Sequence, residues 1–296
     1  MAISLLGSGT RRAGRGAHGD AEAMIEVVAT EVAARRGRTV ARLLAPVVVL
    51  VAGLALWSGV VSAFHVPAYL MPEQWTLART AVDEAGQFVT PVLVTMREAY
   101  LGFLLSAVLG VAVAMAMARW TVLEVGVYPY LLLLQTLPII AVAPLLVVWL
   151  GAGTATNTTV ATVISFFPVV TNTLTGLKAT EANLVDLYRM AGAGRLDELL
   201  TLRLPYAMPY LFAGLRIAAG ASVIGAIVGE FVAGEGGGAG GLGYVITEDA
   251  IQLRTPELFV GVALSCAVAV VLFGGVSFVG NRLLRRWHDS ARRRGE

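Results

Sequence analysis

Long apolar runs separated by short polar stretches dominate this sequence after residue 41. Six of the runs are long enough to cross a bilayer as helices, since a crossing takes about 20 residues at ~1.5 Å rise per residue. They cover residues 43–64, 94–118, 125–150, 158–177, 209–232 and 258–284. None alternates with period two over ten residues, which favours helices over a membrane β-barrel. The pattern therefore predicts an all-α membrane protein with six transmembrane helices.

Polar segments border the six runs. Residues 1–41 are expected to form a cytoplasmic tail, either wholly solvated or with an interfacial helix over residues 20–36. The short apolar stretch at its start precedes the basic residues, which argues against a cleavable signal peptide. Residues 42–285 are expected to form the six-helix domain, and residues 286–296 a basic cytoplasmic tail.

Composition points to lipid as the surrounding solvent. Of the 296 residues, 57% are apolar and 14% are charged, and the mean hydropathy is +0.75. Soluble domains have roughly 45–50% apolar and about 25% charged residues. The single cysteine, Cys266, excludes an internal disulfide, and the three histidines lie far apart. The chain is expected to bind neither a metal ion nor a nucleic acid.

Basic residues predict the orientation. If the N-terminus is cytoplasmic, six crossings return the C-terminus to the cytoplasm. Nineteen of the 22 Lys and Arg residues then lie inside, while Arg79, Arg97 and Arg254 lie outside. An excess of this size favours this topology over its inverse. The loop at 178–203 is therefore expected inside, and the loops at 65–93 and 234–243 outside.

Residues suited to catalysis are scarce. Lys178 is the only lysine, and no G-x-x-x-x-G-K-[ST] motif occurs. The run at 234–243 has seven glycines in ten residues, but it is predicted to lie outside, where no ATP is available. It is interpreted as a flexible or close-packed turn. No catalytic triad and no carboxylate pair deep within the spans is recognised, so a transport subunit is expected rather than an enzyme.

Ionisable residues within the spans are few. Arg97 and Glu98 are placed at the outer start of the second run, close to water. Glu230 follows Pro209 by 21 residues, or about 31 Å of helix, which places it at the outer interface. It is either an interfacial carboxylate that makes a helix-end contact or a gating group. The lack of a buried relay argues against a stand-alone ion-driven carrier.

The third and fourth runs contain the candidate translocation pathway. Gln135 and Thr136 fall near the middle of the third run and precede Pro138. The proline predicts either a packing kink or a break that lines the pathway. Asn172, among several hydroxyl residues of the fourth run, either bonds between helices or lines the pathway. Together with Glu230 these are the candidate pathway residues.

The loop between the fourth and fifth runs has a helical composition over residues 186–200, around Gly192 and Gly194. This stretch predicts a short surface helix with exposed Arg195, Asp197 and Glu198. Such a helix between two spans suits docking to a soluble partner.

This loop resembles the cytoplasmic signature of the permease subunits of bacterial binding-protein-dependent ABC importers. That signature reads E-A-A, then Gly six residues after the E, then L-P twelve residues further on. Here Asp186, Gly192 and Leu204–Pro205 have this spacing. Leu187 and Tyr188 replace the two alanines, and their bulk puts the packing of this helix against an ATPase in doubt.

Further motifs resemble the branch that imports nitrate, sulfonates or taurine and that includes relatives for pyrimidine precursors. They are P-x-x-x-x-x-P-L at 138–145, W-x-G-x-G at 149–153, F-F-P at 166–168, L-P-x-x-x-P-x-x-x-x-G-L-R at 204–216 and G-L-G-Y at 241–244. The resemblance covers about residues 43–285. No single motif is specific, but the combination is.

The resemblance implies a homodimer of this subunit with two P-loop ATPase subunits and an external substrate-binding protein. ATP and Mg would bind to the partner ATPase, and this chain would need no cofactor. Coupling would fall to Asp186, Leu187, Tyr188, Gly192, Arg195, Leu204 and Pro205. Gly192→Leu or Asp186→Arg is expected to uncouple ATP hydrolysis from uptake without preventing insertion.

The substrate is expected to be a sulfonate such as taurine, or nitrate. A neutral vitamin precursor, pyrimidine-like or flavin-like, is the alternative, since the spans offer no Lys or Arg at mid-membrane to compensate a negative charge. A stand-alone channel or carrier and a membrane-embedded enzyme remain competing hypotheses. A neighbouring gene for a P-loop ATPase would favour the importer.

Overall fold

The computed structural model describes residue 45, residues 47–234 and residues 240–292. These residues form helices and include no strand, which confirms the predicted all-α class. Five helices are long and apolar enough to cross a membrane, and a bent pair provides a sixth crossing if its two helices count as one span. The predicted tail at 1–41, most of the glycine-rich run and residues 293–296 lie outside the described residues.

The first unit of the chain ends at Pro67. Its helix, Val47–Phe64, matches the first predicted span, and none of its 18 residues is buried within the chain. His65 follows with φ +48°, and the Val66 N–H donates to the Val61 carbonyl (3.2 Å). The helix therefore ends in a turn close to the predicted residue.

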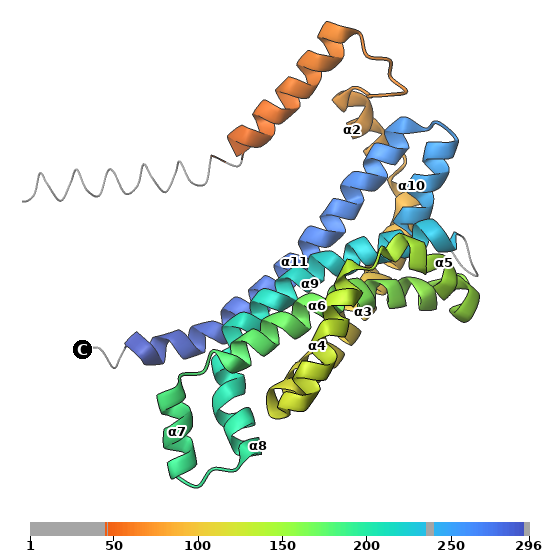
Figure 1. Cartoon of the computed structure of the whole chain (residues 1–296). Coiled ribbons are helices and arrows are strands. Elements are labelled where there is room, and N and C mark those ends of the chain that lie inside the picture. Colours follow the sequence, from red (N-terminus) through yellow and green to blue (C-terminus); the bar gives the residue numbers. More distant parts are fainter. Residues whose placement is uncertain (1–44, 46, 235–239, 293–296) are drawn as a thin grey trace, which may run out of the picture. The chain divides into compact units, whose positions relative to one another are not determined.

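The second unit begins at Ala68. In chain order its helices are α2 (Gln74–Asp83), α3 (Ala85–Arg119), α4 (Thr121–Thr136), α5 (Ile139–Leu150), α6 (Thr154–Lys178), α7 (Ala182–Met190), α8 (Arg195–Asp197), the π-helical segment η1 (Glu198–Arg203), α9 (Leu204–Ala233), α10 (Leu242–Ile251) and α11 (Thr255–Arg292). The long helices α6 and α9 lie side by side and form the centre of this unit (Figure 1). Helix α3 packs on both, and α11 packs on α9 and α10.

Small residues let the backbones of α6 and α9 approach closely. A Cβ atom at Gly225 of α9 would come within 2.5 Å of the Ala161 Cα of α6, and one at Gly214 within 2.7 Å of the Asn172 Cβ. Glycine at such positions allows van der Waals contact between backbones, which is how helices associate without a hydrophobic driving force in lipid. The contact runs along most of α9, so the two helices connect both ends of the unit.

The third predicted span is not one helix. Helices α4 and α5 meet at an angle of 100° across Leu137 and Pro138. Pro138 has no N–H to bond the Leu134 carbonyl, and its ring excludes Leu137 from the helical region; Leu137 accordingly has φ −63° and ψ 127°. Of the two expectations for Pro138, a kink or a break, the structure shows the break, so the third predicted span consists of two helices.

The remaining spans were located correctly but predicted too short. Helix α3 begins at Ala85, α9 at Leu204 and α11 at Thr255, each before the predicted start. The predicted loop at 65–93 contains α2 and the first turns of α3, which meet at Glu84. Hydropathy detects only the apolar part of a helix, whereas the backbone hydrogen bonds continue through polar residues at both ends.

Candidate functional site

A helical hairpin, residues 182–203, joins α6 to α9 at one end of the second unit (Figure 1). After α7, Gly192 turns the chain with φ +79°, a conformation that glycine adopts at little steric cost. The Gly194 N–H donates to the Asp197 carboxylate (3.3 Å) where α8 begins. The loop helix is confirmed, but not as one helix over 186–200, because the glycine pair separates two helices.

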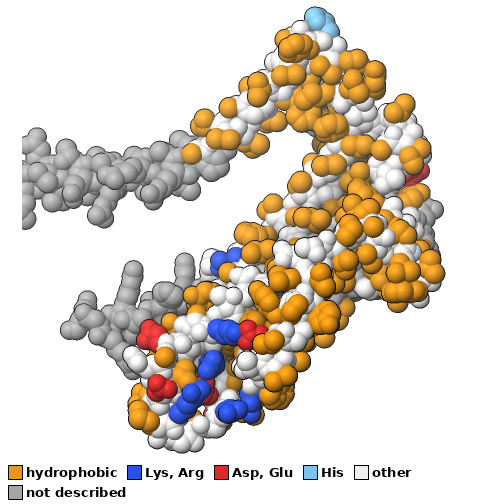
Figure 2. Space-filling view, viewed as in Figure 1, with side chains coloured by type: hydrophobic (Ala, Val, Ile, Leu, Met, Phe, Trp, Pro, Cys, Tyr) orange, Lys and Arg blue, Asp and Glu red, His pale blue; other side chains and the backbone are white. Residues whose placement is uncertain are grey.

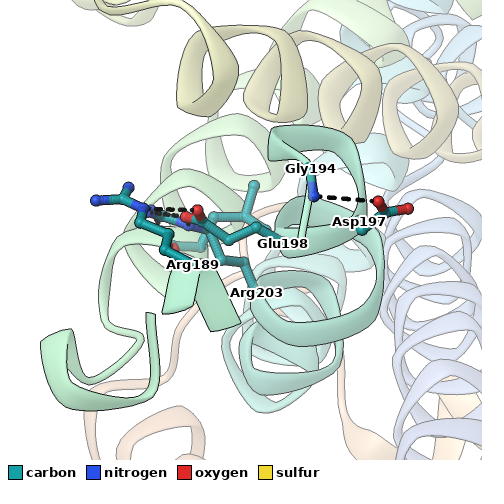
Figure 3. Close-up of polar contacts among 6 residues, drawn as sticks. Arg189, Gly194, Asp197, Glu198 and Arg203 are labelled. Carbon is teal, nitrogen blue, oxygen red and sulfur yellow. Dashed lines mark hydrogen bonds and ion pairs between the residues drawn. The ribbon is translucent and has the colours of Figure 1, made fainter. Parts of the chain in front are cut away.

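Glu198 holds this hairpin together. Its carboxylate accepts hydrogen bonds from Arg189 Nε (3.1 Å) and Arg203 Nε (2.7 Å) (Figure 3). Arg203 Nη1 also donates to the Leu177 carbonyl near the end of α6 (3.5 Å). One carboxylate therefore ties α7 to η1, and through Arg203 to α6. Because Glu198 is only 5% exposed, the prediction that it lies on the surface is wrong.

One feature of the sequence could have indicated that Glu198 pairs with two arginines. Arginines precede and follow Glu198 at separations of nine and five residues, but contact across the first separation requires the chain to reverse. The reversal depends on the turn at Gly192, which the prediction of one continuous helix did not include.

The seven predicted coupling residues lie together on the hairpin or at the first turn of α9. Asp186, Leu187, Gly192 and Arg195 are exposed, while Tyr188, Leu204 and Pro205 are partly buried. The spacing of the signature motif thus identified residues that lie together although they belong to three helical segments. Their part in coupling stays a prediction.

Large apolar side chains are exposed on this hairpin. They are Leu184, Leu187, Met190, Leu196 and Leu200. On the visible face of the second unit, acidic and basic side chains gather at the same end, over α7 and α8 (Figure 2). Exposed apolar residues among charged ones are typical of a surface that contacts another protein.

The predicted pathway residues divide between several places. Gln135 lines a cavity of about 300 Å³ at the bend between α4 and α5, which Phe167 and Pro168 of α6 also line. The Thr136 hydroxyl donates to the Leu133 carbonyl of its own helix (2.9 Å), and Pro138 precedes the first residue of α5. The break at Pro138 therefore does line a cavity.

Asn172 is not among the residues that line this cavity. Its side-chain amide donates to the Pro168 carbonyl (2.8 Å), and its Cβ faces Gly214 of α9. Its amide thus bonds within α6, while its side chain packs between the two central helices.

Glu230 lies near the other end of α9, about 39 Å of helix from Leu204 at ~1.5 Å per residue. Its carboxylate accepts the Thr95 hydroxyl (2.7 Å) and the Gly243 N–H (2.6 Å). The Thr95 hydroxyl in turn accepts the Leu242 N–H (2.8 Å). Glu230 is only 1% exposed, and its bond to Gly243 at the start of α10 is the kind of helix-end contact expected from the sequence. Its position at the outer interface stays a prediction.

A second carboxyl group lies beside Glu230. Glu98 of α3 is also 1% exposed and accepts the Asn157 amide of α6 (3.0 Å). It follows Thr95, which donates to Glu230, by three residues on α3, and Asn157 packs against Gly229, the residue before Glu230. The expectation of water near Glu98 is wrong, because its side chain is buried. We refer to Thr95, Glu98, Asn157 and Glu230 as the carboxyl cluster. They lie on three different helices, and nothing in their spacing predicted the contact.

Comparison with known proteins decides the family. Residues 102–289 match the family described as "Binding-protein-dependent transport system inner membrane component". This segment contains the bent pair, the hairpin and Glu230. The chain belongs to this family.

The similar curated proteins are permeases of the same kind. The formylaminopyrimidine transport permease protein ThiX of Halalkalibacterium halodurans is 32% identical over 217 residues, 73% of this chain and 85% of that protein. The riboflavin transport system permease protein RibX of Chloroflexus aurantiacus is 31% identical over 239 residues, 80% and 87% respectively. SsuC of Bacillus subtilis, named for the transport of aliphatic sulfonates, is 27% identical over 250 residues, 84% and 87%.

The resemblance recognised in the sequence is thereby confirmed. This chain is a multi-pass membrane protein of the ABC transporter permease family, a transport subunit rather than an enzyme. The relatives are named for heterocycles as well as for sulfonates, so the family does not decide the substrate.

Proposed function

We propose that this permease is the membrane subunit of an importer and that separate ATPase subunits dock on the hairpin at 182–203. The observation that carries the proposal is the exposed apolar and charged surface of this hairpin, which has the spacing of the family's coupling signature. A surface helix held by an ion pair to two spans can transmit a push, whereas a flexible loop cannot.

The connection from the hairpin into the membrane is rigid. One helical segment runs without interruption from Arg195 to Ala233 over 39 residues. Glu198 bonds α7 to the start of this segment, and the glycine contacts hold α9 against α6. A displacement of α7 by a docked ATPase would therefore move α9 and α6 together, over the full thickness of the membrane.

The proposed assembly is a homodimer of permeases with two P-loop ATPases and an external substrate-binding protein. ATP and Mg would be held by the ATPase. The excess of basic residues supports a cytoplasmic hairpin and cytoplasmic termini. The carboxyl cluster would then lie at the outer end of the bundle.

Two substrate classes compete. A sulfonate such as taurine, or nitrate, is the class that the sequence motifs favour, and SsuC supports it. A neutral heterocycle is favoured by the cavity at the bend, where Gln135 is the one polar residue of the lining and no charged side chain is present. ThiX and RibX, named for heterocyclic compounds, support this second class.

Docking can be tested with two cysteine variants of equal exposure. In a Cys266→Ser background, Met190→Cys (79% exposed) and Ile251→Cys (78% exposed) lie on the hairpin and at the end of α10. We expect a short thiol crosslinker to join Met190→Cys, but not Ile251→Cys, to the ATPase. A membrane-impermeant thiol reagent added to cells should label only Ile251→Cys. Crosslinking at position 251, or outside labelling at position 190, would refute the proposal.

The substrate class can be separated by competition. ATP-driven uptake into proteoliposomes would be measured with the cognate binding protein and a panel of taurine, alkylsulfonates, nitrate, aminopyrimidines and flavins. Inhibition by the anions alone supports the sulfonate or nitrate class. Inhibition by the heterocycles alone supports the neutral class.

A further inference from the structure

The carboxyl cluster joins four segments that are distant in the sequence. Thr95 and Glu98 come from α3, Asn157 from α6 and Glu230 from α9, while Leu242 and Gly243 belong to the first turn of α10. Thr95, Glu98 and Glu230 are at most 1% exposed, and Asn157 is nearly as buried. Any movement of α10 away from α3 or α9 must break these hydrogen bonds.

Two carboxyl groups in contact need a proton between them. When ionised, each carboxylate is only an acceptor, and two anions side by side without water repel each other strongly. Burial of Glu98 and Glu230 in one cluster therefore favours a state in which one of them is neutral, as in other buried carboxyl pairs.

The pattern of donors indicates which residue carries the proton. Both oxygens of Glu230 already accept, one from Thr95 and one from Gly243. Oε2 of Glu98 accepts from Asn157, and no group that the structure describes donates to its Oε1. Oε1 of Glu98 is thus free to carry the proton and donate it to Glu230.

Neither glutamate has a cationic partner in the part of the chain that the structure describes, since none of its ion pairs includes Glu98 or Glu230. Asp249 of α10 pairs with Arg254, which lies between α10 and α11 (2.9 Å), and Glu248 and Glu257 act on Asp249. Arg97 of α3 lines a different, apolar groove, and the charged residue of α6, Lys178, lies at its opposite end.

We propose that Glu98 and Glu230 share one proton and form a latch that closes the outer end of the permease. With the proton bound, the latch holds α10 and the end of α9 on α3. When the outer end opens for substrate, water reaches the pair, the proton leaves, and two adjacent anions favour separation. The permease thus has a bistable element of its own at the end remote from the ATPase.

The asparagine of the cluster fits such a latch. Asn157 Oδ1 has no hydrogen-bond partner in the described structure although it is buried. An unpaired buried amide oxygen is unfavourable in a permanent joint. In an opened outer end it would be hydrated, which lowers the free energy of opening. The closed state is therefore held by the proton without being irreversible.

Glutamine variants separate the two carboxyl groups. Glu98→Gln places an amide N–H where the proton is proposed to lie, and so imitates the closed latch at every pH. The full-length permease, in complex with its ATPase and in lipid nanodiscs, would be melted at about pH 6 and about pH 9. We expect the wild-type midpoint to fall by about 4 °C or more at the higher pH, and that of Glu98→Gln to change by less than half as much.

Glu230→Gln is predicted to behave differently, although the substitution is the same. Its amide N–H would face either the Gly243 N–H or the Thr95 hydroxyl, which already donate to Glu230. We expect a midpoint roughly 4–8 °C lower at both pH values, because a buried donor loses its acceptor. Glu124→Gln, which disturbs the contact with Lys178 at the other end of the bundle, serves as the control and should keep the wild-type pH profile. A wild-type profile in Glu98→Gln, or identical behaviour of the two cluster variants, would overturn the shared proton.

Uptake tests the latch itself. If Glu98→Gln keeps the outer end closed, ATP-driven uptake at about pH 8 should fall roughly tenfold while the ATPase still co-purifies. A flat melting profile with unchanged uptake would overturn the latch. This uptake measurement rests on the proposed function, but the melting profiles do not. If the wild type itself shows no ATP-driven uptake, the proposed function fails, and the melting profiles still decide whether the proton is shared.

Discussion

The helical segment from Arg195 to Ala233 has a buried glutamate near each end, and the two are stabilised in opposite ways. Glu198 lies between Arg189 and Arg203, whose guanidinium groups neutralise it. Glu230 shares a buried cluster with another carboxyl group, and it accepts hydrogen bonds from a hydroxyl and a backbone N–H. The first is a permanent ion pair, whereas the second depends on a proton that can leave.

This difference matches the mechanical role of each end. An ATPase that pushes on the hairpin needs a joint that stays closed throughout the cycle, and ion pairs with arginine do not depend on pH in the physiological range. The opposite end must open and close, and a group that changes charge on hydration suits that task. The predictions below test the contrast, beginning with the largest expected effect.

Replacing Glu198 by Ala should have the largest effect. It removes both ion pairs and leaves Arg203, which is mostly buried, without an anion. Breaking a buried pair costs about 3–5 kcal/mol; because Arg189 is largely exposed, we expect about 2 kcal/mol here. In nanodiscs the melting midpoint should fall by roughly 4–8 °C, and the ATPase should no longer co-purify.

Asp197→Ala is the matched control for this change. The neighbouring carboxylate is exposed and reaches only the Gly194 N–H at 3.3 Å. The midpoint should shift by less than about 2 °C, and ATPase binding should be preserved. Equal losses in the two variants would mean that removing either carboxylate destabilises the hairpin. The ion pairs of Glu198 with Arg189 and Arg203 would then have no special role.

The turn at Gly192 gives the next effect. A leucine there would have to adopt φ +79°, which costs roughly 1–2 kcal/mol for an L-residue. We expect Gly192→Leu to insert into the membrane normally but to hydrolyse ATP without uptake, since α7 would be misdirected. Ala191→Leu adds the same side chain one position earlier at φ −76° and should transport. The ratio of uptake to ATP hydrolysis in proteoliposomes measures both.

A carboxylate paired with a guanidinium also occurs at the latch end, which permits a comparison within that end. Burial raises the pKa of Asp249 above its ordinary value, although Arg254 opposes the shift. Arg254→Ala should therefore raise the pKa further. Since the folded protein then binds this proton more tightly than the unfolded chain, stability falls as pH rises from the ordinary pKa of Asp to the raised one.

The expected loss for Arg254→Ala is about 1 kcal/mol near pH 7, because the arginine is partly exposed. It should shrink near pH 4, where the neutral carboxyl group needs no cation. Melting midpoints at the two pH values, with Gln252→Ala as the exposed control, measure it. A loss that is independent of pH would show that Arg254 acts through packing and not through its charge.

The two ends also differ in how far the sequence predicted them. The hairpin was located because its signature lies within 20 consecutive residues, and local turn chemistry follows from local sequence. The carboxyl cluster was missed because Thr95, Asn157 and Glu230 are brought together by the packing of three helices. The small residues that bring these helices together carry little information about register.

Breaks within helices were predicted only in part. Pro91, Pro129, Pro144, Pro168 and Pro209 lie inside continuous helices, whereas Pro138 separates α4 from α5. Every proline removes a hydrogen bond, but whether the chain bends by 100° depends on what packs on either side of the bend. That is a property of the tertiary structure, as is the burial of Glu198 under the reversed chain.

The smallest effect concerns the only lysine. Lys178 contacts Glu124 between the end of α6 and the start of α4, and its side chain is about half exposed. Exposed pairs contribute roughly 0.2–1 kcal/mol and are screened by salt. Lys178→Ala should therefore lower the midpoint by at most about 3 °C at low ionic strength, and the difference should vanish in about 1 M salt. Since Glu198 is buried, the shift in Glu198→Ala should persist at the same salt concentration. If salt abolished both shifts, the hairpin would be held by surface charge alone. The two ends would then differ only in that Glu198 has positively charged neighbours, whereas Glu230 has an acidic one.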